Sequence, residues 1–194
     1  AQLAAKIAEW EKANARSIAD PWVVLDPSAL KATGRLKLTR EADGSITVAG
    51  PAQKSDLTIT AATDLEGIAA VRLEVLTDPK QPKNGPGRAD DGNFVLSEFQ
   101  LSAAPKASPD KPKMIGLRDA LADFSQATFD VAKAIDGTSG DSKGWAVSPR
   151  TGLTHWATFR TKEPVGGPGG TVLTFTLWVR PVRGETAQPF ESPD

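Results

Sequence analysis

The chain has 194 residues, of which 39% are hydrophobic and 24% charged, with a net charge of -1 and no cysteine. This balance is typical of a globular domain with one core and not of a disordered segment. The small net charge offers no attraction to nucleic acid, and no apolar run approaches the ~20 residues that span a bilayer. The lack of cysteine excludes disulfides, thiolate metal sites and cysteine nucleophiles.

Residues 2–15 predict a short N-terminal helix. Leu3, Ile7 and Trp10 recur at helical spacing among good helix formers. Because one short helix is marginal alone, we expect Trp10 to anchor it to the domain. The chain starts at Ala1 without a signal-type apolar stretch, so we expect a fragment or processed product of a larger protein.

From residue 21 onwards the pattern changes to period two. Short segments rich in β-branched and aromatic residues alternate with turn residues, which indicates an all-β sandwich or barrel. These segments are 22–25, 34–39, 45–50, 56–61, 69–76, 93–101, 127–132, 144–147, 155–161 and 171–179. Asp43-Gly44 predicts a hairpin. We expect an antiparallel β-sandwich over 21–182, between a helix and linker (1–20) and a linker tail (183–194).

Catalytic chemistry finds little support. His155 is the single histidine and falls in a strand-like segment. Multi-histidine zinc sites are therefore excluded, and a Ser-His-Asp triad would depend on this one residue. No G-x-S-x-G, P-loop or H-E-x-x-H motif occurs. We interpret His155 as a hydrogen-bonded packing residue and expect a protein that is not an enzyme.

Two acidic turns are candidate sites for a hard cation. Asp136 and Asp141 lie among small residues, and calcium takes six to eight oxygens from carboxylates and backbone carbonyls. A second candidate is formed by Asp90, Asp91 and Asn93. Asp-Gly is also a common turn dipeptide, so an ordinary turn stays open as the alternative.

Aromatic residues suggest a surface for sugars. The chain has five tryptophans, seven phenylalanines and no tyrosine. Carbohydrate sites place flat aromatic faces beside polar side chains. Trp156 and Trp178 lie in strands where neighbouring apolar residues compete for the inward face, so we expect at least one ring to point outwards. The alternative is that all five tryptophans belong to the core or a seam.

The loop 84–93 is a second candidate binding surface. Arg88, Asp90, Asp91 and Asn93 supply hydroxyl-bonding groups beside a Gly-Pro-Gly turn that lets the backbone approach a ligand. The alternative is that Arg88 pairs with Asp90 or Asp91 and holds the loop shut.

Three strings carry a resemblance to a known family: RLEVLTDPKQPKNGPGRADDGNFVLSEFQL, ALADFSQATFDVAKAIDGTSGDSKGWAV and HWATF. Their most specific motifs are GPGR…GNFVLSE and AIDG…GWA. Over about residues 22–178 the chain resembles a β-sandwich domain of large planctomycete-type proteins that also carry a c-type cytochrome domain and two large domains of unknown function. The resemblance implies a secreted protein, periplasmic or at the cell surface, with neighbouring domains as partners.

A more distant likeness is to discoidin or galactose-binding-domain-like jelly-roll sandwiches, among them many carbohydrate-binding modules. In these, an A-x-DG…W segment and a Glu-containing strand meet at a structural calcium ion. Here AIDGTSGDSKGW and LSEFQL match the two segments in inverted order, as in a circular permutant. The likeness makes Trp145 a core residue. It implies as calcium ligands the carboxylates of Glu98 and Asp136, the carbonyls of Ser97, Lys133 and Thr138, and optionally Asp141.

Two functions of different classes compete. The leading hypothesis is a carbohydrate-binding module that holds a polysaccharide near a catalytic or redox partner domain. The rival is a structural or interaction domain that packs on its neighbours and binds no sugar. An exposed aromatic ring beside a charged side chain would favour the first, and a large apolar patch would favour the second.

Overall fold

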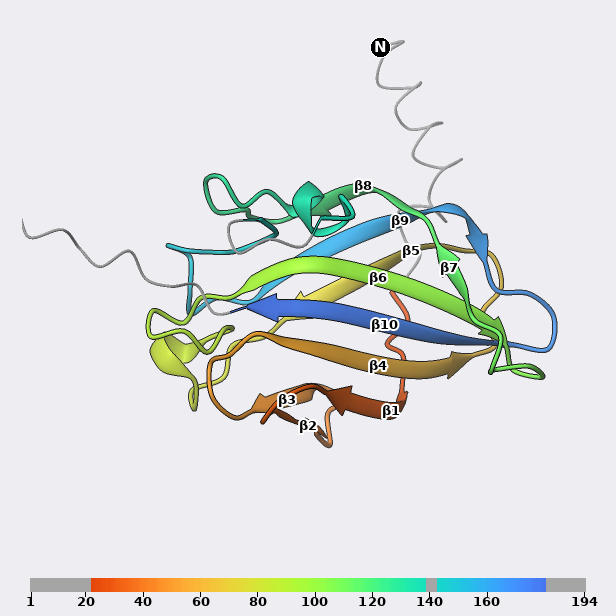
Figure 1. Cartoon of the computed structure of the whole chain (residues 1–194), viewed down its shortest axis with the longest axis horizontal. Helices are drawn as coiled ribbons and strands as arrows, with labels where there is room; N and C mark the ends of the chain where they lie inside the picture. The colour runs from red at the N-terminus through yellow and green to blue at the C-terminus, as the bar shows by residue number, and fades with distance from the viewer. Residues whose placement is uncertain (1–21, 139–142, 181–194) are drawn as a thin grey trace, which may run out of the picture.

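The computed structural model describes residues 22–138 and 143–180, which form ten strands joined by turns and loops (Figure 1). The predicted N-terminal helix, Asp141 and the predicted tail from 183 lie outside these residues. The strands are β1 Pro27–Ala32, β2 Lys37–Arg40, β3 Ile46–Ala49, β4 Ser55–Thr63, β5 Ile68–Val75, β6 Val95–Pro105, β7 Lys113–Ile115, β8 Leu117–Ala122, β9 His155–Val165 and β10 Thr171–Arg180. Two short 3-10 helices are η1 Pro82–Asn84 and η2 Val131–Ala134.

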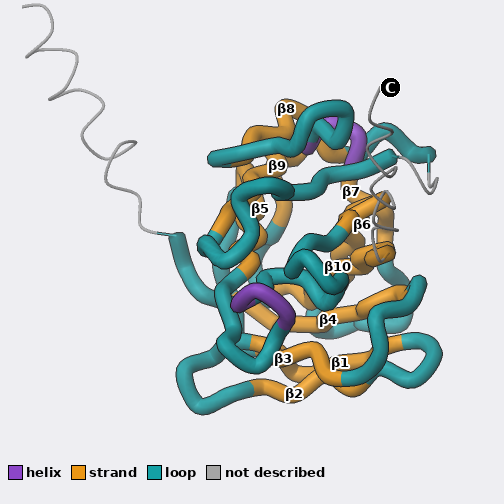
Figure 2. Tube along the Cα trace, turned by 90° about the vertical axis from the view of Figure 1, so that its left-hand side faces the viewer, coloured by secondary structure: helices purple, strands orange, loops and turns teal. Residues whose placement is uncertain are grey.

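The strands form two packed antiparallel sheets and a separate hairpin, so the predicted all-β antiparallel sandwich is confirmed. The large sheet has the order β1-β4-β10-β6-β7 and the small sheet the order β5-β9-β8. Figure 2 shows them as two layers, with the β2–β3 hairpin beside β1. No helix in the described part of the chain has the length and apolarity needed to cross a membrane.

The core lies between the two sheets. Phe99 of β6 and Phe159 of β9 stack across it, with ring centroids 4.5 Å apart, and Phe175 of β10 flanks Phe99 at 6.2 Å. Trp145 is fully buried, as predicted, and its indole Nε1 donates to the Phe124 carbonyl at 2.8 Å. Stacked and buried rings of this size contribute a large share of the apolar surface removed from water.

Several predicted segments differ from the structure. Residues 22–25 belong to no strand, and 144–147 contributes only a bridge between Trp145 and Leu96. The segment 127–132 partly forms η2, because the Asp130 side chain accepts a hydrogen bond from the Ala132 N–H and begins the turn there. β1, β7 and β8 were not predicted; in β8 a bulge after Arg118 interrupts the alternation that marks a strand.

Alternation along the strands gives the sandwich two outer faces. In β10, Leu173 and Leu177 point into the core, so Trp178 lies on the outer face of the large sheet. In β9, Phe159 points inwards, so Trp156 lies on the outer face of the small sheet. The two tryptophans therefore occupy opposite sides of the molecule.

The small sheet leaves part of the large sheet's inner face uncovered. A cleft of about 1530 Å³ opens there, between β5 on one side and the β2–β3 hairpin on the other. Its walls include Leu57 and Ile59 of β4, Leu73 of β5, and Phe175 and Leu177 of β10. The cleft is thus an open, largely apolar continuation of the core.

Gly144 permits a close backbone approach to β6. Its φ is +124°, and a Cβ there would lie 2.2 Å from the Leu96 carbonyl oxygen. Only glycine tolerates both conditions. This explains the glycine that directly precedes Trp145, since Trp145 and Leu96 exchange backbone hydrogen bonds of 2.9 Å in both directions.

We predict that Gly144→Ala lowers the free energy of unfolding by about 2–3 kcal/mol, because backbone would have to move. Gly167→Ala is the matched control, since nothing lies within 4 Å of its Cβ position. It should change stability by less than about 0.5 kcal/mol. Urea titration of both variants makes the measurement, and equal stabilities would contradict the close approach.

Candidate functional site

Glu98 is a buried carboxylate on the outer side of β6. It pairs across the sheet with Trp178, and its side chain is only 6% exposed. Within the described part of the chain, its Oε2 atom has no hydrogen-bond partner. A buried acceptor without a donor is costly, and it is an arrangement that a cation can relieve.

The turn that follows η2 brings a second carboxylate to Glu98. Burial and, to a smaller extent, the negative charge of Asp136 raise the pKa of Glu98 to about 7, against a hydrogen bond from the Gly137 N–H that lowers it. The Thr138 hydroxyl and N–H donate to Asp136 and hold its pKa below the usual range, with the charges of Lys143 and Lys133 adding to this. Glu98 is therefore the member of the pair that resists ionisation.

Two of the residues that the likeness implies as calcium ligands lie close together. The LSE strand and the AIDG turn, implied to meet by the distant likeness, do meet here: η2 packs against β6, and Asp136 and Gly137 act directly on Glu98. Within residues 22–138 and 143–180, no group of three acidic, histidine or cysteine side chains could hold a metal. Backbone carbonyls would have to complete a shell around two carboxylates, as calcium sites commonly allow.

The other implied ligands have the following places. Lys133 lies in η2, where its Nζ donates to the Thr128 carbonyl. Because a lysine side chain has no oxygen, only its backbone carbonyl could contact a cation. Ser97 lies next to Glu98 in β6; its hydroxyl donates to the Trp178 carbonyl at 3.0 Å and accepts from Arg180 Nε at 3.0 Å. That hydroxyl is thus already engaged, and only the Ser97 carbonyl is implied as a ligand.

The loop 84–93 is held by internal bonds. Arg88 donates to the Pro51 carbonyl at 3.0 Å, and not to an aspartate of its own loop as the alternative had it. Asn93 is 1% exposed, and its amide bonds to Gln126 and Val147. The Asn93 side chain is therefore not accessible to a sugar in this conformation.

The two aspartates of this loop have different surroundings. Asp91 accepts a hydrogen bond from the Asn93 N–H at 3.0 Å, which closes a turn. Asp90 is exposed. Of the four predicted loop residues, Arg88 and Asn93 line the inter-sheet cleft, and both aspartates are exposed.

A cluster on the outer face of the small sheet was only partly predicted. The Arg72 guanidinium of β5 lies 5.0 Å from the Trp156 ring centroid and 5.9 Å from that of Trp22. Arg72 also pairs with Glu74 at 2.9 Å, and Glu74 lies directly opposite Trp156 in the sheet. Trp22 is 49% exposed. We call Trp22, Arg72, Glu74 and Trp156 the tryptophan–arginine platform.

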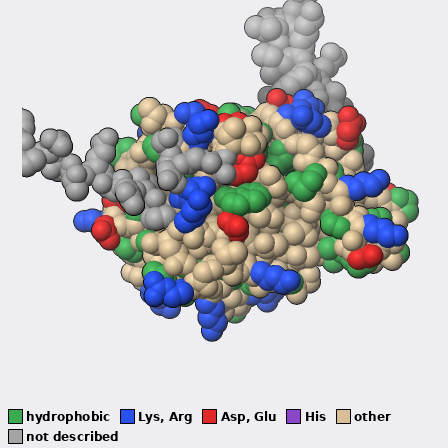
Figure 3. All heavy atoms as spheres, in the orientation of Figure 1, with side chains coloured by type: hydrophobic (Ala, Val, Ile, Leu, Met, Phe, Trp, Pro, Cys, Tyr) green, Lys and Arg blue, Asp and Glu red, His purple; other side chains and the backbone are tan. Residues whose placement is uncertain are grey.

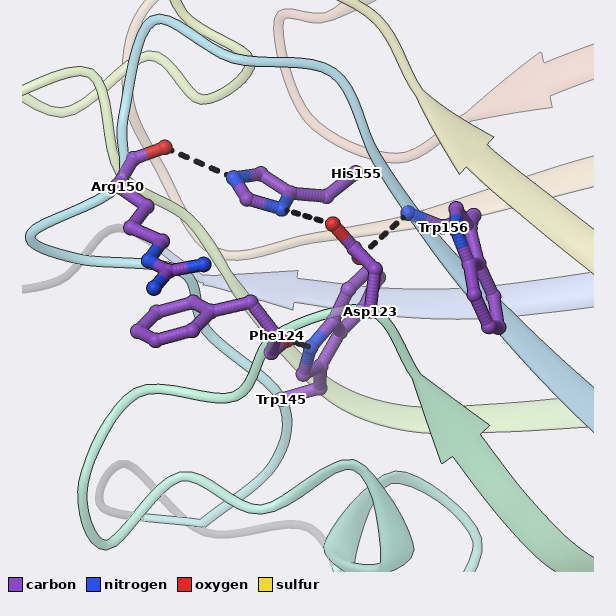
Figure 4. Close-up of polar contacts among 6 residues, drawn as sticks. All are labelled: Asp123, Phe124, Trp145, Arg150, His155 and Trp156. Atoms are coloured by element: carbon purple, nitrogen blue, oxygen red, sulfur yellow. Dashed lines mark hydrogen bonds and ion pairs between the residues drawn. The ribbon is translucent and has the colours of Figure 1, made fainter.

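His155 lies on the inner side of β9, next to Trp156 (Figure 4). Its Nδ1 is 2.7 Å from Asp123 Oδ2, and its Nε2 is 2.8 Å from the Arg150 carbonyl. Asp123 also accepts from the Trp156 N–H at 2.9 Å, so it fixes the first two residues of β9. Because His155 is 2% exposed and both ring nitrogens are engaged, it fits the predicted packing role.

We predict that calcium raises the melting temperature of the wild-type chain and not of Glu98→Gln. A ligand at about a hundredfold excess over Kd adds about 2.7 kcal/mol to the folded state. Glu163→Gln, an exposed carboxylate on β9, is the matched control and should keep the full calcium response. Thermal melts with calcium and with chelator supply the comparison; a chelator-insensitive wild type would remove the site.

We also predict a pH dependence in chelator. The Glu98 pKa is about 7 when folded and near 4.5 when unfolded, so only the folded state holds the proton between these values. Stability should be full below about pH 4.5 and fall as the pH rises to about 7. Glu98→Gln should lack this fall. A wild type whose melting temperature rises over the same interval, relative to Glu98→Gln, would contradict the assignment.

Comparison with known proteins adds no homologue. No family model, no curated protein and no solved structure matches the chain. The resemblance to the planctomycete-type domain and to galactose-binding-like modules therefore remains an expectation. Function has to be inferred from the side chains described above.

Proposed function

We propose that this chain is a non-catalytic carbohydrate-binding module of a larger secreted bacterial protein, at work in the periplasm or at the cell surface. The observation that carries the proposal is the tryptophan–arginine platform. Two indole rings, one of them half exposed, flank a guanidinium on the open face of a rigid sheet. Fixed aromatic faces beside hydrogen-bonding groups are what sugar recognition requires.

The platform is held in place before any ligand arrives. Arg72 is fixed from three directions, by the two rings and by the Glu74 carboxylate. Trp156 is fixed through its own backbone by Asp123. Side chains that are already ordered lose little conformational entropy on binding, which favours even a weak ligand.

The proposed calcium ion has a structural part in this function. Glu98 and Asp136, with the carbonyls of Ser97, Lys133 and Thr138, would hold it between β6 and the turn after η2. Bound there, it supplies positive charge that allows both carboxylates to ionise in a buried place. The site lies by the large sheet, across the sandwich from the platform, so it stabilises the fold without touching the sugar.

A second function is favoured by a different feature, the apolar cleft between β5 and the β2–β3 hairpin. Uncovered apolar surface of this kind commonly marks contact with another protein surface. In this alternative, the chain is an interaction domain that packs on neighbouring cytochrome or enzyme domains and binds no sugar. The outer face of the large sheet offers less to such a partner, since Figure 3 shows mainly uncharged polar and backbone atoms there.

We predict that Trp156→Ala and Trp22→Ala each weaken polysaccharide binding by about tenfold, the equivalent of about 1.4 kcal/mol. Met114→Ala, which removes an exposed apolar side chain on β7, is the matched control and should bind normally. Wild-type affinity should lie in the micromolar to millimolar range. A polysaccharide-retardation screen finds the ligand, and titration measures each variant.

Trp178→Ala separates the two outer faces. If binding survives loss of Trp22 and Trp156 and fails with Trp178→Ala, the sugar lies on the large sheet and the platform is wrongly assigned. If the screen retards nothing and an isolated neighbouring domain of the parent protein binds the chain, the interaction function is correct.

A further inference from the structure

The small sheet's outer face carries cations beyond the platform. Arg160 of β9 lies directly opposite Arg118 of β8, and Lys162 follows two residues later on the same side of β9. Arg118 pairs with Asp119 at 2.9 Å. Within the described part of the chain, neither Arg160 nor Lys162 makes an ion pair or a side-chain hydrogen bond.

Two arginines in direct cross-strand register are unfavourable for the sheet itself. Like charges at paired positions repel, and this repulsion destabilises an antiparallel pair. The neighbouring bulge makes the arrangement more unusual, since Asp119 there adopts a positive φ of 48°. Bulges often re-aim side chains next to binding sites. The local charge is also at odds with the chain as a whole, whose net charge is -1.

The cations and the platform lie along one line. Trp156, Thr158 and Arg160 occupy every second position of β9 and share its outer side. The tryptophan and the arginine are therefore four residues apart. At 3.3 Å per residue, this places them about 13 Å apart. Thr158, directly opposite Arg72 in the sheet, lies between them and offers a hydroxyl. The row is longer than one sugar ring and suits an extended chain.

Building on the proposed function, we propose that the outer face of β5, β9 and β8 binds an acidic polysaccharide lying along β9. Its sugar rings pack on the tryptophan–arginine platform, and its carboxylate or sulfate groups meet Arg160 and Arg118. Arginine donates to such anions through two parallel N–H groups, which gives direction as well as charge attraction. The anionic ligand also relieves the repulsion between the two arginines.

The test uses affinity electrophoresis of the full chain in gels that contain one polymer each. Polygalacturonate presents carboxylates, κ-carrageenan presents sulfates, dextran is neutral, and polyuridylate is a polyanion that carries its charge on phosphodiesters and has no pyranose rings. We expect retardation by one or both acidic polysaccharides, weakened by salt, and none of comparable strength by dextran or polyuridylate. Arg160→Gln should weaken binding by about tenfold.

Matched variants keep the result interpretable. Lys37→Gln removes an exposed cation on β2, far from this face in the sheet order, and should leave retardation unchanged. Unchanged melting of Arg160→Gln shows that the loss is not unfolding. If dextran is bound as well as the acidic polymers, or Arg160→Gln binds like wild type, the acidic-ligand inference fails and the glycan-binding function stands. If no polysaccharide is retarded, both fail, and polyuridylate binding alone would indicate a nucleic-acid surface.

Discussion

The backbone pairing of Trp145 with Leu96 fixes much of what lies outside the regular sheets. Trp145 is fully buried and bonds through its indole to the Phe124 carbonyl, so one residue ties together three segments distant in sequence. This pairing holds the chain between β8 and β9 against β6. The turn with Asp136 is thereby held over Glu98, and the same segment leads on to His155 at the start of β9. The pairing of Trp145 with Leu96 requires glycine at position 144, because any side chain there would clash with the backbone of β6.

Much of the fold could be predicted because burial on one side of a strand leaves a period of two. The alternating threonines of β4 and β10 and the Asp43-Gly44 turn indicated strands and a hairpin that the structure contains. The 3-10 turn η2 could not be foreseen in the same way, because Ala127, Phe129 and Val131 are apolar at alternate positions, which is the pattern of a strand. In β8 the bulge shifts the pattern by a residue, and alternation is lost.

The candidate sites also differ in whether local sequence or long-range strand pairing determines them. Outward orientation of Trp156 and Trp178 follows from their apolar neighbours, so it could be inferred locally. Their separation onto opposite faces depends on which sheet each strand joins, and that is a matter of long-range pairing. Arg72 and Trp22 escaped prediction for this reason: the register that sets β5 beside β9 appears in neither strand alone. The approach of Asp136 to Glu98 came only from a resemblance, because the two lie far apart in sequence.

Trp22 has a position unlike that of its partners, since it lies outside both sheets while Arg72, Glu74 and Trp156 are built into strands. Its contact with Arg72 therefore links the platform to the chain that leads into β1. A sugar that rests on the Trp22 ring would restrain the chain leading into β1, and by thermodynamic reciprocity anything that restrains that chain would strengthen the hold on the sugar.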